Sequence, residues 1–192
     1  MRSNLLSFLI TAFVIALSPQ LQALNFSGFV SRSVTGKLKL KDERLNKNFE
    51  LTCKDPSVKN ALKKLKTGDY LSFDGLKDPY KSKVLIDSIN FVGLSQLLAT
   101  WQGDDNYCYS FTSFNEFSIY PKSKITNCSD PKVIPRNFAY SISSSDTNWF
   151  VLISDNEASY TADLNIINPT KAEITLYDPN TGTVLRLVKL SK

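Results

Sequence analysis

Histidine is missing from this chain of 192 residues, and its absence removes the most common chemistry of enzymes at neutral pH. Histidine is the usual general base and a frequent metal ligand, so no Ser-His-Asp or Cys-His nucleophile can form. The chain also lacks a glycine-rich phosphate loop and a Cys/His zinc cluster. Its acidic clusters, at 104–105 and 155–157, match no calcium-loop spacing. We therefore expect no catalytic residue, no metal and no cofactor.

Long hydrophobic runs are scarce as well, and the longest lies at the N-terminus. Arg2 precedes an uncharged run from Leu5 to Leu17, Pro19 ends it, and Ala23 offers a small residue for cleavage. This pattern is typical of a secretory signal, and the run is shorter than the ~20 residues that span a bilayer. We predict that residues 1–23 are a signal peptide and that the protein is exported, periplasmic or secreted. An uncleaved membrane anchor is the alternative.

Cysteine is rare, with only three residues, and export changes how these are interpreted. An oxidising compartment permits one disulfide and leaves one thiol over. Cys108 and Cys128 are 20 positions apart in the same half of the chain and are the favoured pair. Cys53 alternates with Phe49 and Leu51, which predicts an inert thiol that points into a core.

Net charge is unevenly distributed along the chain. Residues 24–95 hold 14 basic and 8 acidic residues, whereas residues 96–192 hold 8 basic and 10 acidic ones. The interruption at Gly93-Leu94-Ser95 falls near this change in charge. We predict two domains, 24–94 and 95–192, with the excess positive charge on the first.

The first domain shows three strand patterns, a helix and two further strands. Alternating apolar residues predict strands at 25–32, 34–41 and 48–54, and later at 69–73 and 83–92. The helix between them has Asp55 as its N-cap, Pro56 at its first position and an apolar stripe to Leu65, and we expect Gly68 to end it. This order, with Gly28 in a strand that must bend, resembles the OB fold, a five-stranded barrel.

The resemblance to the OB fold implies a ligand face on the second and third strands and the loops beside them. A set of basic and aromatic residues would form that surface here: Lys37, Lys39, Lys41, Lys77, Tyr80 and Lys81. The charge favours an anionic polysaccharide or an anionic lipid surface. The outward side of these two strands has no aromatic residue, so nucleic acid is disfavoured as a partner. A solvated lysine face that only keeps the protein soluble is the simpler interpretation.

The second domain reads as a series of short strands separated by turns, which predicts an antiparallel barrel or sandwich. The expected strands are 106–112, 116–120, 138–143, 149–153, 159–168, 172–177 and 183–190. The stretch 97–101 is similar to the opening of lipocalin-type barrels, in which a Gly-x-Trp motif lies on the first strand; Ala99 replaces the glycine. In that family a basic residue of the last strand packs over the tryptophan. The resemblance therefore implies that Arg186 covers Trp101 and closes the barrel, whereas the alternative is an ordinary core tryptophan with Arg186 exposed.

These features predict a mainly β protein: an OB-like barrel with one short helix, then an antiparallel lipocalin-like barrel. The function expected is that of an exported, non-catalytic binding or envelope-associated protein. Such a protein would contact anionic surfaces through its lysine-rich first domain. Two alternatives remain open. A barrel of this size either fills itself with side chains or carries a small hydrophobic ligand, and a hydrolase would need two carboxyl groups that face each other across a cleft.

Overall fold

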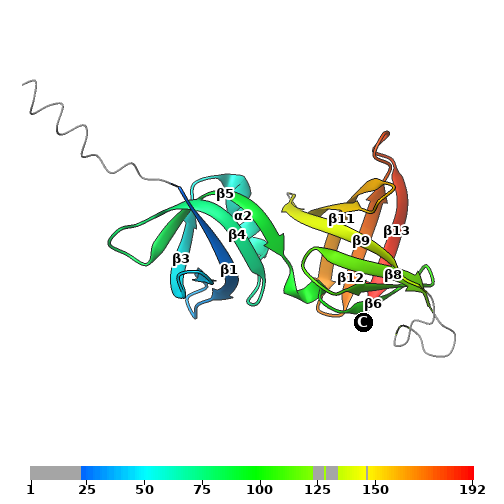
Figure 1. The fold of residues 1–192 in the computed structure, drawn as a ribbon, viewed down its shortest axis with the longest axis horizontal. Coiled ribbons are helices and arrows are strands. Elements are labelled where there is room, and N and C mark those ends of the chain that lie inside the picture. Colours follow the sequence, from blue (N-terminus) through cyan, green and yellow to red (C-terminus); the bar gives the residue numbers. More distant parts are fainter. Residues whose placement is uncertain (1–22, 123–127, 129–133, 146) are drawn as a thin grey trace, which may run out of the picture.

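The computed structural model describes residues 23–122, 128, 134–145 and 147–192. Two closed β-barrels lie side by side and are joined near Leu94 (Figure 1). The predicted fold class is confirmed: a five-stranded barrel with one short helix precedes an eight-stranded antiparallel barrel. The predicted signal peptide, residues 1–23, lies outside the described residues apart from Ala23.

The first barrel has the strand order β1-β2-β3-β5-β4, and β4 returns to pair with β1. Its strands are β1 (Leu24–Arg32), β2 (Leu38–Asp42), β3 (Lys47–Cys53), β4 (Tyr70–Lys77) and β5 (Lys83–Gly93). Within this barrel the β3–β5 pair is parallel and the other pairs are antiparallel. The ring of Phe26 lies 5.5 Å from that of Phe49 and 5.4 Å from that of Phe73, and these three buried rings fill the centre.

Two strands differ from the pattern expected from the sequence. β2 begins at Leu38 rather than at Val34, because Ser33 to Gly36 form a turn in which the N–H of Gly36 donates to the carbonyl of Ser33. β4 continues to Lys77 instead of ending at Phe73, since Gly75 lets β4 approach β5 closely. A Cβ at Gly75 would lie 2.6 Å from the carbonyl oxygen of Leu85.

The helix α2 (Pro56–Lys64) begins as predicted but ends earlier. The carboxylate of Asp55 accepts from the backbone N–H of Ser57 at 2.6 Å, which caps the first turn. Gly68 does not end the helix; Leu65 is the C-cap and is already extended, with ψ of 142°. The reason is burial, because Leu65 turns into the barrel core and is 1% exposed.

The second barrel is an up-and-down meander of eight antiparallel strands that closes between β13 and β6. The strands are β6 (Thr100–Gly103), β7 (Tyr107–Phe111), β8 (Glu116–Pro121), β9 (Arg136–Ser144), β10 (Trp149–Ser154), β11 (Ser159–Asn168), β12 (Lys171–Tyr177) and β13 (Val184–Ser191). The short 3-10 helix η1 (Ser95–Leu97) leads into β6. Because successive strands run in opposite directions, the turns after β7, β9 and β11 share one end of the barrel. The turns after β6, β10 and β12 share the other.

Helix α2 joins the two barrels through the turn after β9. The ammonium of Lys64 donates to the carbonyls of Ser145 and Asn148 and lies 5.4 Å from the centre of the Trp149 ring. The amide of Asn60 donates to the same Ser145 carbonyl at 3.3 Å. One end of the second barrel therefore faces the first barrel, and the β12–β13 turn points away from it (Figure 1).

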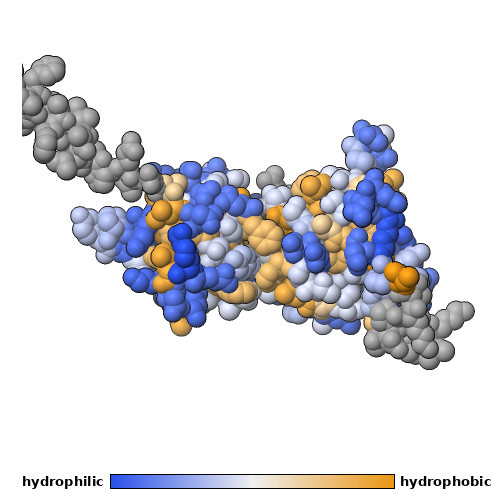
Figure 2. All heavy atoms as spheres, viewed as in Figure 1, coloured by the Kyte–Doolittle hydropathy of each residue, from blue (hydrophilic) through white to orange (hydrophobic). Residues whose placement is uncertain are grey.

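An aromatic contact and a buried carboxylate complete this junction. Phe114, from the turn after β7, stacks on Tyr70 with ring centres 5.9 Å apart. It lies so close to Gly93 that a Cβ there would be 2.5 Å from the ring. Asp69, 2% exposed, accepts from the N–H and the hydroxyl of Ser95, each at 2.8 Å. Apolar side chains gather where the barrels meet, in the middle of Figure 2.

Candidate functional site

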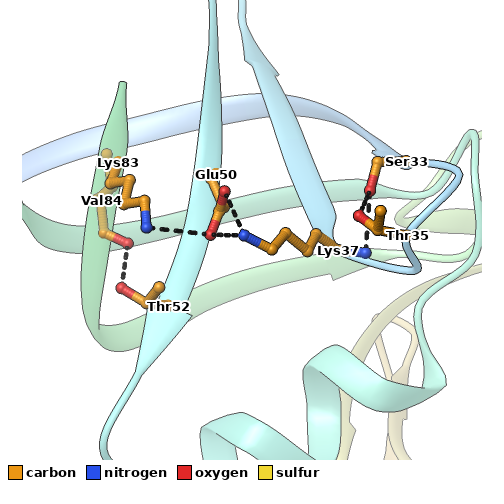
Figure 3. Close-up of polar contacts among 7 residues, drawn as sticks. All are labelled: Ser33, Thr35, Lys37, Glu50, Thr52, Lys83 and Val84. Carbon is orange, nitrogen blue, oxygen red and sulfur yellow. Dashed lines mark hydrogen bonds and ion pairs between the residues drawn. The ribbon is translucent and has the colours of Figure 1, made fainter. Parts of the chain in front are cut away.

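The lysine-rich surface of the first barrel exists, but a carboxylate neutralises part of it. Glu50 on β3 accepts from Lys37 at 3.0 Å and pairs with Lys83 at 3.4 Å (Figure 3). The hydrogen bond from Lys37 is the main reason why the pKa of Glu50 is lowered. Lys39 and Lys41 are exposed on β2 and form no ion pair with any described residue. The free positive charge on this surface is therefore smaller than the sequence implies.

The remaining residues expected on this surface lie on the β4–β5 hairpin. The ammonium of Lys77 lies 5.8 Å from the centre of the Phe49 ring and so covers one end of the barrel. Tyr80 is 93% exposed at the hairpin tip, where the backbone N–H groups of Tyr80 and Lys81 donate to Asp78. These contacts form a turn. The tip therefore offers an aromatic ring and a cation to solvent, outside the Glu50 cluster.

Trp101 lies at the closed end of the second barrel, next to the first barrel. It is 0% exposed, and its indole N–H donates to the carbonyl of Leu97 at 2.9 Å. The cation above this ring is Lys192, whose ammonium lies 4.4 Å from the ring centre. Burial lowers the pKa of Lys192, and the ammonium also donates to the carbonyl of Gln96. A basic residue thus lies over the buried ring of Trp101.

Arg186, the residue expected in that role, lies elsewhere. It pairs with Asp105, of the turn after β6, at 2.9 Å. Register explains the difference: β6 pairs with Leu190 and Ser191, so only the last residues of the chain reach the height of Trp101. The cation expected over Trp101 was Arg186; in the structure Lys192 lies over this ring, and Arg186 pairs with Asp105 instead.

The end of the second barrel that faces away from the first barrel holds an open cavity of about 520 Å³. Its walls are mainly aliphatic and aromatic side chains. They include Phe117, Ile119, Phe138, Ile153, Ile174, Leu176 and Val188. Volumes of this order are typical of sites for small organic ligands, which are concave and mostly apolar.

The deeper half of the same barrel is filled. Leu97, Phe111, Tyr140 and Leu164 are among the residues around an internal void of only about 10 Å³, too small for anything beyond a single water molecule. Phe111 and Phe117 stack with ring centres 4.9 Å apart and form the boundary between the filled and the hollow parts. The barrel interior is therefore open at one end and filled with side chains at the other. Neither of the two alternatives expected from the sequence holds for the whole interior.

Polar groups are confined to the rim of the cavity. The polar lining residues are Tyr107, Tyr109, Tyr160, Arg136 and Arg186, and no aspartate or glutamate in the described part of the chain contributes. Tyr109 donates to Asp105 at 2.6 Å, and burial is the main reason why the pKa of the Tyr109 phenol is raised. The sequence did not identify Arg136, and it showed Asp105 only as a member of an acidic cluster, because the roles of both residues depend on contacts with other strands.

The predicted disulfide between Cys108 and Cys128 is present, with Cα atoms 5.7 Å apart. The hydroxyl of Tyr120 donates to the carbonyl of Cys128 at 2.8 Å and holds this residue against β7 and β8. Cys53 is a free thiol, half-buried against the first core, and burial raises its pKa. A raised pKa disfavours the reactive thiolate.

The chemistry required for a carboxylate hydrolase is a carboxyl group with a raised pKa opposite an ionised one. Asp155 and Asp178 have lowered pKa values instead, mainly because backbone N–H groups donate to them. Both carboxylates hold turns and are poor general acids. Among the described residues, no cluster of three or more His, Cys, Asp or Glu side chains is placed to hold a metal ion.

Within the described part of the chain, no helix has the length and apolar character needed to cross a membrane. Neither a family model, nor a curated protein, nor a solved structure matches this sequence.

Proposed function

We propose that this protein is a non-catalytic binding protein that carries a small apolar molecule in the open end of its second barrel. The observation that supports this most is the cavity of about 520 Å³ with its apolar walls. Burial of a ligand's apolar surface there supplies roughly 25 cal/mol per Å² removed from water.

The protein works, on this proposal, outside the cytoplasm. The Cys108–Cys128 disulfide supports export because such bonds persist in oxidising compartments. The signal pattern of residues 1–23 supports it at the level of sequence. A poorly soluble molecule in the periplasm or outside the cell needs a carrier with an apolar interior, and a rigid barrel suits that task.

The test is a fluorescence titration with N-phenyl-1-naphthylamine, a neutral apolar probe that brightens when it leaves water. We expect one probe per chain. Ile119→Trp should weaken binding about tenfold or more, because the larger ring displaces apolar contacts worth about 1.5–3 kcal/mol. The control is Leu152→Trp, which adds the same ring on an exposed position of β10. Equal probe affinity in the Ile119→Trp variant and the wild-type protein would overturn the proposal.

A second function has separate support: contact of the first barrel with an anionic polymer or lipid surface. Lys39 and Lys41 provide positive charge that no described carboxylate neutralises. Replacement of both lysines by Glu should reduce retention on a heparin column, and salt should reduce it further. Unchanged retention in the double variant would leave the lysine face with no role beyond solubility.

A further inference from the structure

Arg186 occupies a part of the second barrel where the wall is incomplete. β6 ends at Gly103 and pairs with β13 only at Leu190 and Ser191. The segment of β13 before Val188 pairs with β12 on one side and with no strand of the described residues on the other. Arg186 lies on this segment and lines the cavity at its mouth.

The guanidinium of Arg186 forms an ion pair with Asp105 at 2.9 Å, and the Asp105 side chain is 5% exposed. This carboxylate accepts hydrogen bonds from the Tyr109 hydroxyl at 2.6 Å and from the Tyr107 N–H at 3.1 Å. Two hydrogen-bond donors and a paired guanidinium on one buried carboxylate leave it little capacity to bind a ligand. The ion pair also fixes the position of the arginine.

The donors of Arg186 are mostly unused. Arginine has five N–H donors, and no hydrogen bond from the Arg186 guanidinium to a described residue is found beside its ion pair with Asp105. No other partner of this guanidinium is found among the described residues, and its side chain is 47% exposed. Arg136 differs, since its Nε and Nη2 both donate to Asp155, Glu157 is within 3.4 Å, and its guanidinium lies over the Phe138 ring at 5.2 Å.

Charge at the cavity favours an anion over a cation. Among the described residues, the charged side chains that line it are Arg136 and Arg186. The carboxylates that pair with them, Asp105, Asp155 and Glu157, are not part of the lining. A ligand head in the mouth therefore meets N–H donors first. Guanidinium groups bind carboxylates through two parallel hydrogen bonds, which is the geometry that the free edge of Arg186 offers.

We propose that the ligand is an amphiphile, an apolar chain that ends in a carboxylate, and that Arg186 binds the carboxylate at the cavity mouth. This inference rests on the proposed function, because the chain of the amphiphile occupies the apolar cavity. Arg186 is then a binding residue, and Asp105 is the residue that positions it.

The experiment compares decanoate, decanol and decylamine as competitors of N-phenyl-1-naphthylamine, since the three share one chain and differ only in the head. We expect decanoate to compete best. Arg186→Gln should weaken decanoate about tenfold and leave decanol within about twofold, because it removes hydrogen bonds to a charged group. Lys189→Gln is the matched control, as it removes the same charge from the exposed side of the same strand.

Each outcome separates the inference from the function on which it rests. Absence of probe binding in the wild-type protein refutes the proposed function itself. Probe binding with equal competition by decanoate and decanol overturns only the role of Arg186. Arg186→Lys provides a second variant in case the glutamine disturbs folding. Lysine keeps the positive charge but cannot form two parallel hydrogen bonds to a carboxylate. Its affinity for decanoate should therefore lie between that of the wild-type protein and that of Arg186→Gln. Wild-type affinity for decanoate in both variants would also overturn the inference.

Discussion

Single charged residues decide how much of the lysine-rich surface is available. Glu50 forms ion pairs with Lys37 and Lys83. It therefore neutralises part of a surface on which the sequence places mainly lysines. The alternation of β2 and β3 predicts that these residues point outward. It does not predict that Lys83, from a strand parallel to β3, comes within 3.4 Å of Glu50.

Glu50→Gln should increase retention on heparin, because Lys37 and Lys83 then lose the carboxylate that neutralises them. The expected change is a later elution in a salt gradient. Glu173→Gln, on β12 of the second barrel, removes the same charge far from this face and is the control. The same shift in both variants would mean that retention follows net charge and not this surface.

A glycine controls the shape of the first barrel. A Cβ at Gly28 would lie 2.0 Å from the carbonyl oxygen of Lys41, so β1 and β2 cannot keep their pairing around a larger residue. Gly28→Ala should lower the free energy of unfolding by about 1–3 kcal/mol, the range for overpacking. A Cβ at Gly36 would have no atom within 4 Å. Gly36→Ala should therefore lower the free energy of unfolding by only about 1 kcal/mol, because its φ of 77° is unfavourable for alanine. Urea denaturation of both variants tests this order, and an equal or reversed effect would contradict it.

At the level of the secondary-structure elements, helix α2 is stabilised by its N-cap, Asp55, which the sequence predicts. The side-chain hydrogen bond from Ser57, followed by the backbone N–H groups of Ser57 and Val58, lowers the pKa of Asp55 below its ordinary value. A carboxyl group with a lowered pKa stabilises the folded state above its unfolded pKa. That contribution is lost as the pH falls through the folded pKa.

Asp55→Ala should therefore lower the urea midpoint at pH 7, and the difference from the wild-type protein should shrink in acid, below about pH 4. Asp78→Ala, at a turn of the β4–β5 hairpin, is a control that leaves the helix intact. Urea midpoints measured from pH 7 down to pH 2.5 test the sign. A difference that grows toward low pH would contradict the account.

A helix or strand can be predicted from the sequence when its pattern of apolar residues lies within the element itself. β11 and α2 were predicted closely because a period of two or 3.6 residues repeats within each of them. β6 was expected only from the resemblance of 97–101 to the first strand of lipocalin-type barrels, since its four residues are too few for an alternating pattern. The contact expected between Arg186 and Trp101 is not found, for a different reason. Alternation gives the face of a residue on β13, but the height of that residue above Trp101 depends on pairing with β6.

At the scale of the whole molecule, two barrels share a junction that gives the second barrel one closed and one open end. Lys64, Phe114 and Asp69 make contacts across or beside this junction. The sequence could not show that the interior is half hollow, because an inward aromatic residue looks the same in a packed core and in a cavity wall. Tyr140 and Tyr109 illustrate this: one is beside the filled base and the other lines the cavity.

Phe114→Ala should loosen the two barrels, because it removes the ring that packs on Tyr70 and Gly93. We expect the wild-type protein to tumble as one body and the variant to show different rotational correlation times for the two barrels in ¹⁵N relaxation. Phe150→Ala, on the exposed side of β10, is the control. Indistinguishable tumbling in the wild type and the Phe114 variant would show that the remaining contacts suffice.

The most direct measurement is a two-dimensional NMR titration of the ¹⁵N-labelled protein with decanoate. The account predicts saturable shifts at backbone amides around the cavity, on β7, β8, β12 and β13, with little change on the first barrel. Shifts confined to β2, β3 and the β4–β5 hairpin, or no saturable shift at all, would contradict the claim that the second barrel is the binding site.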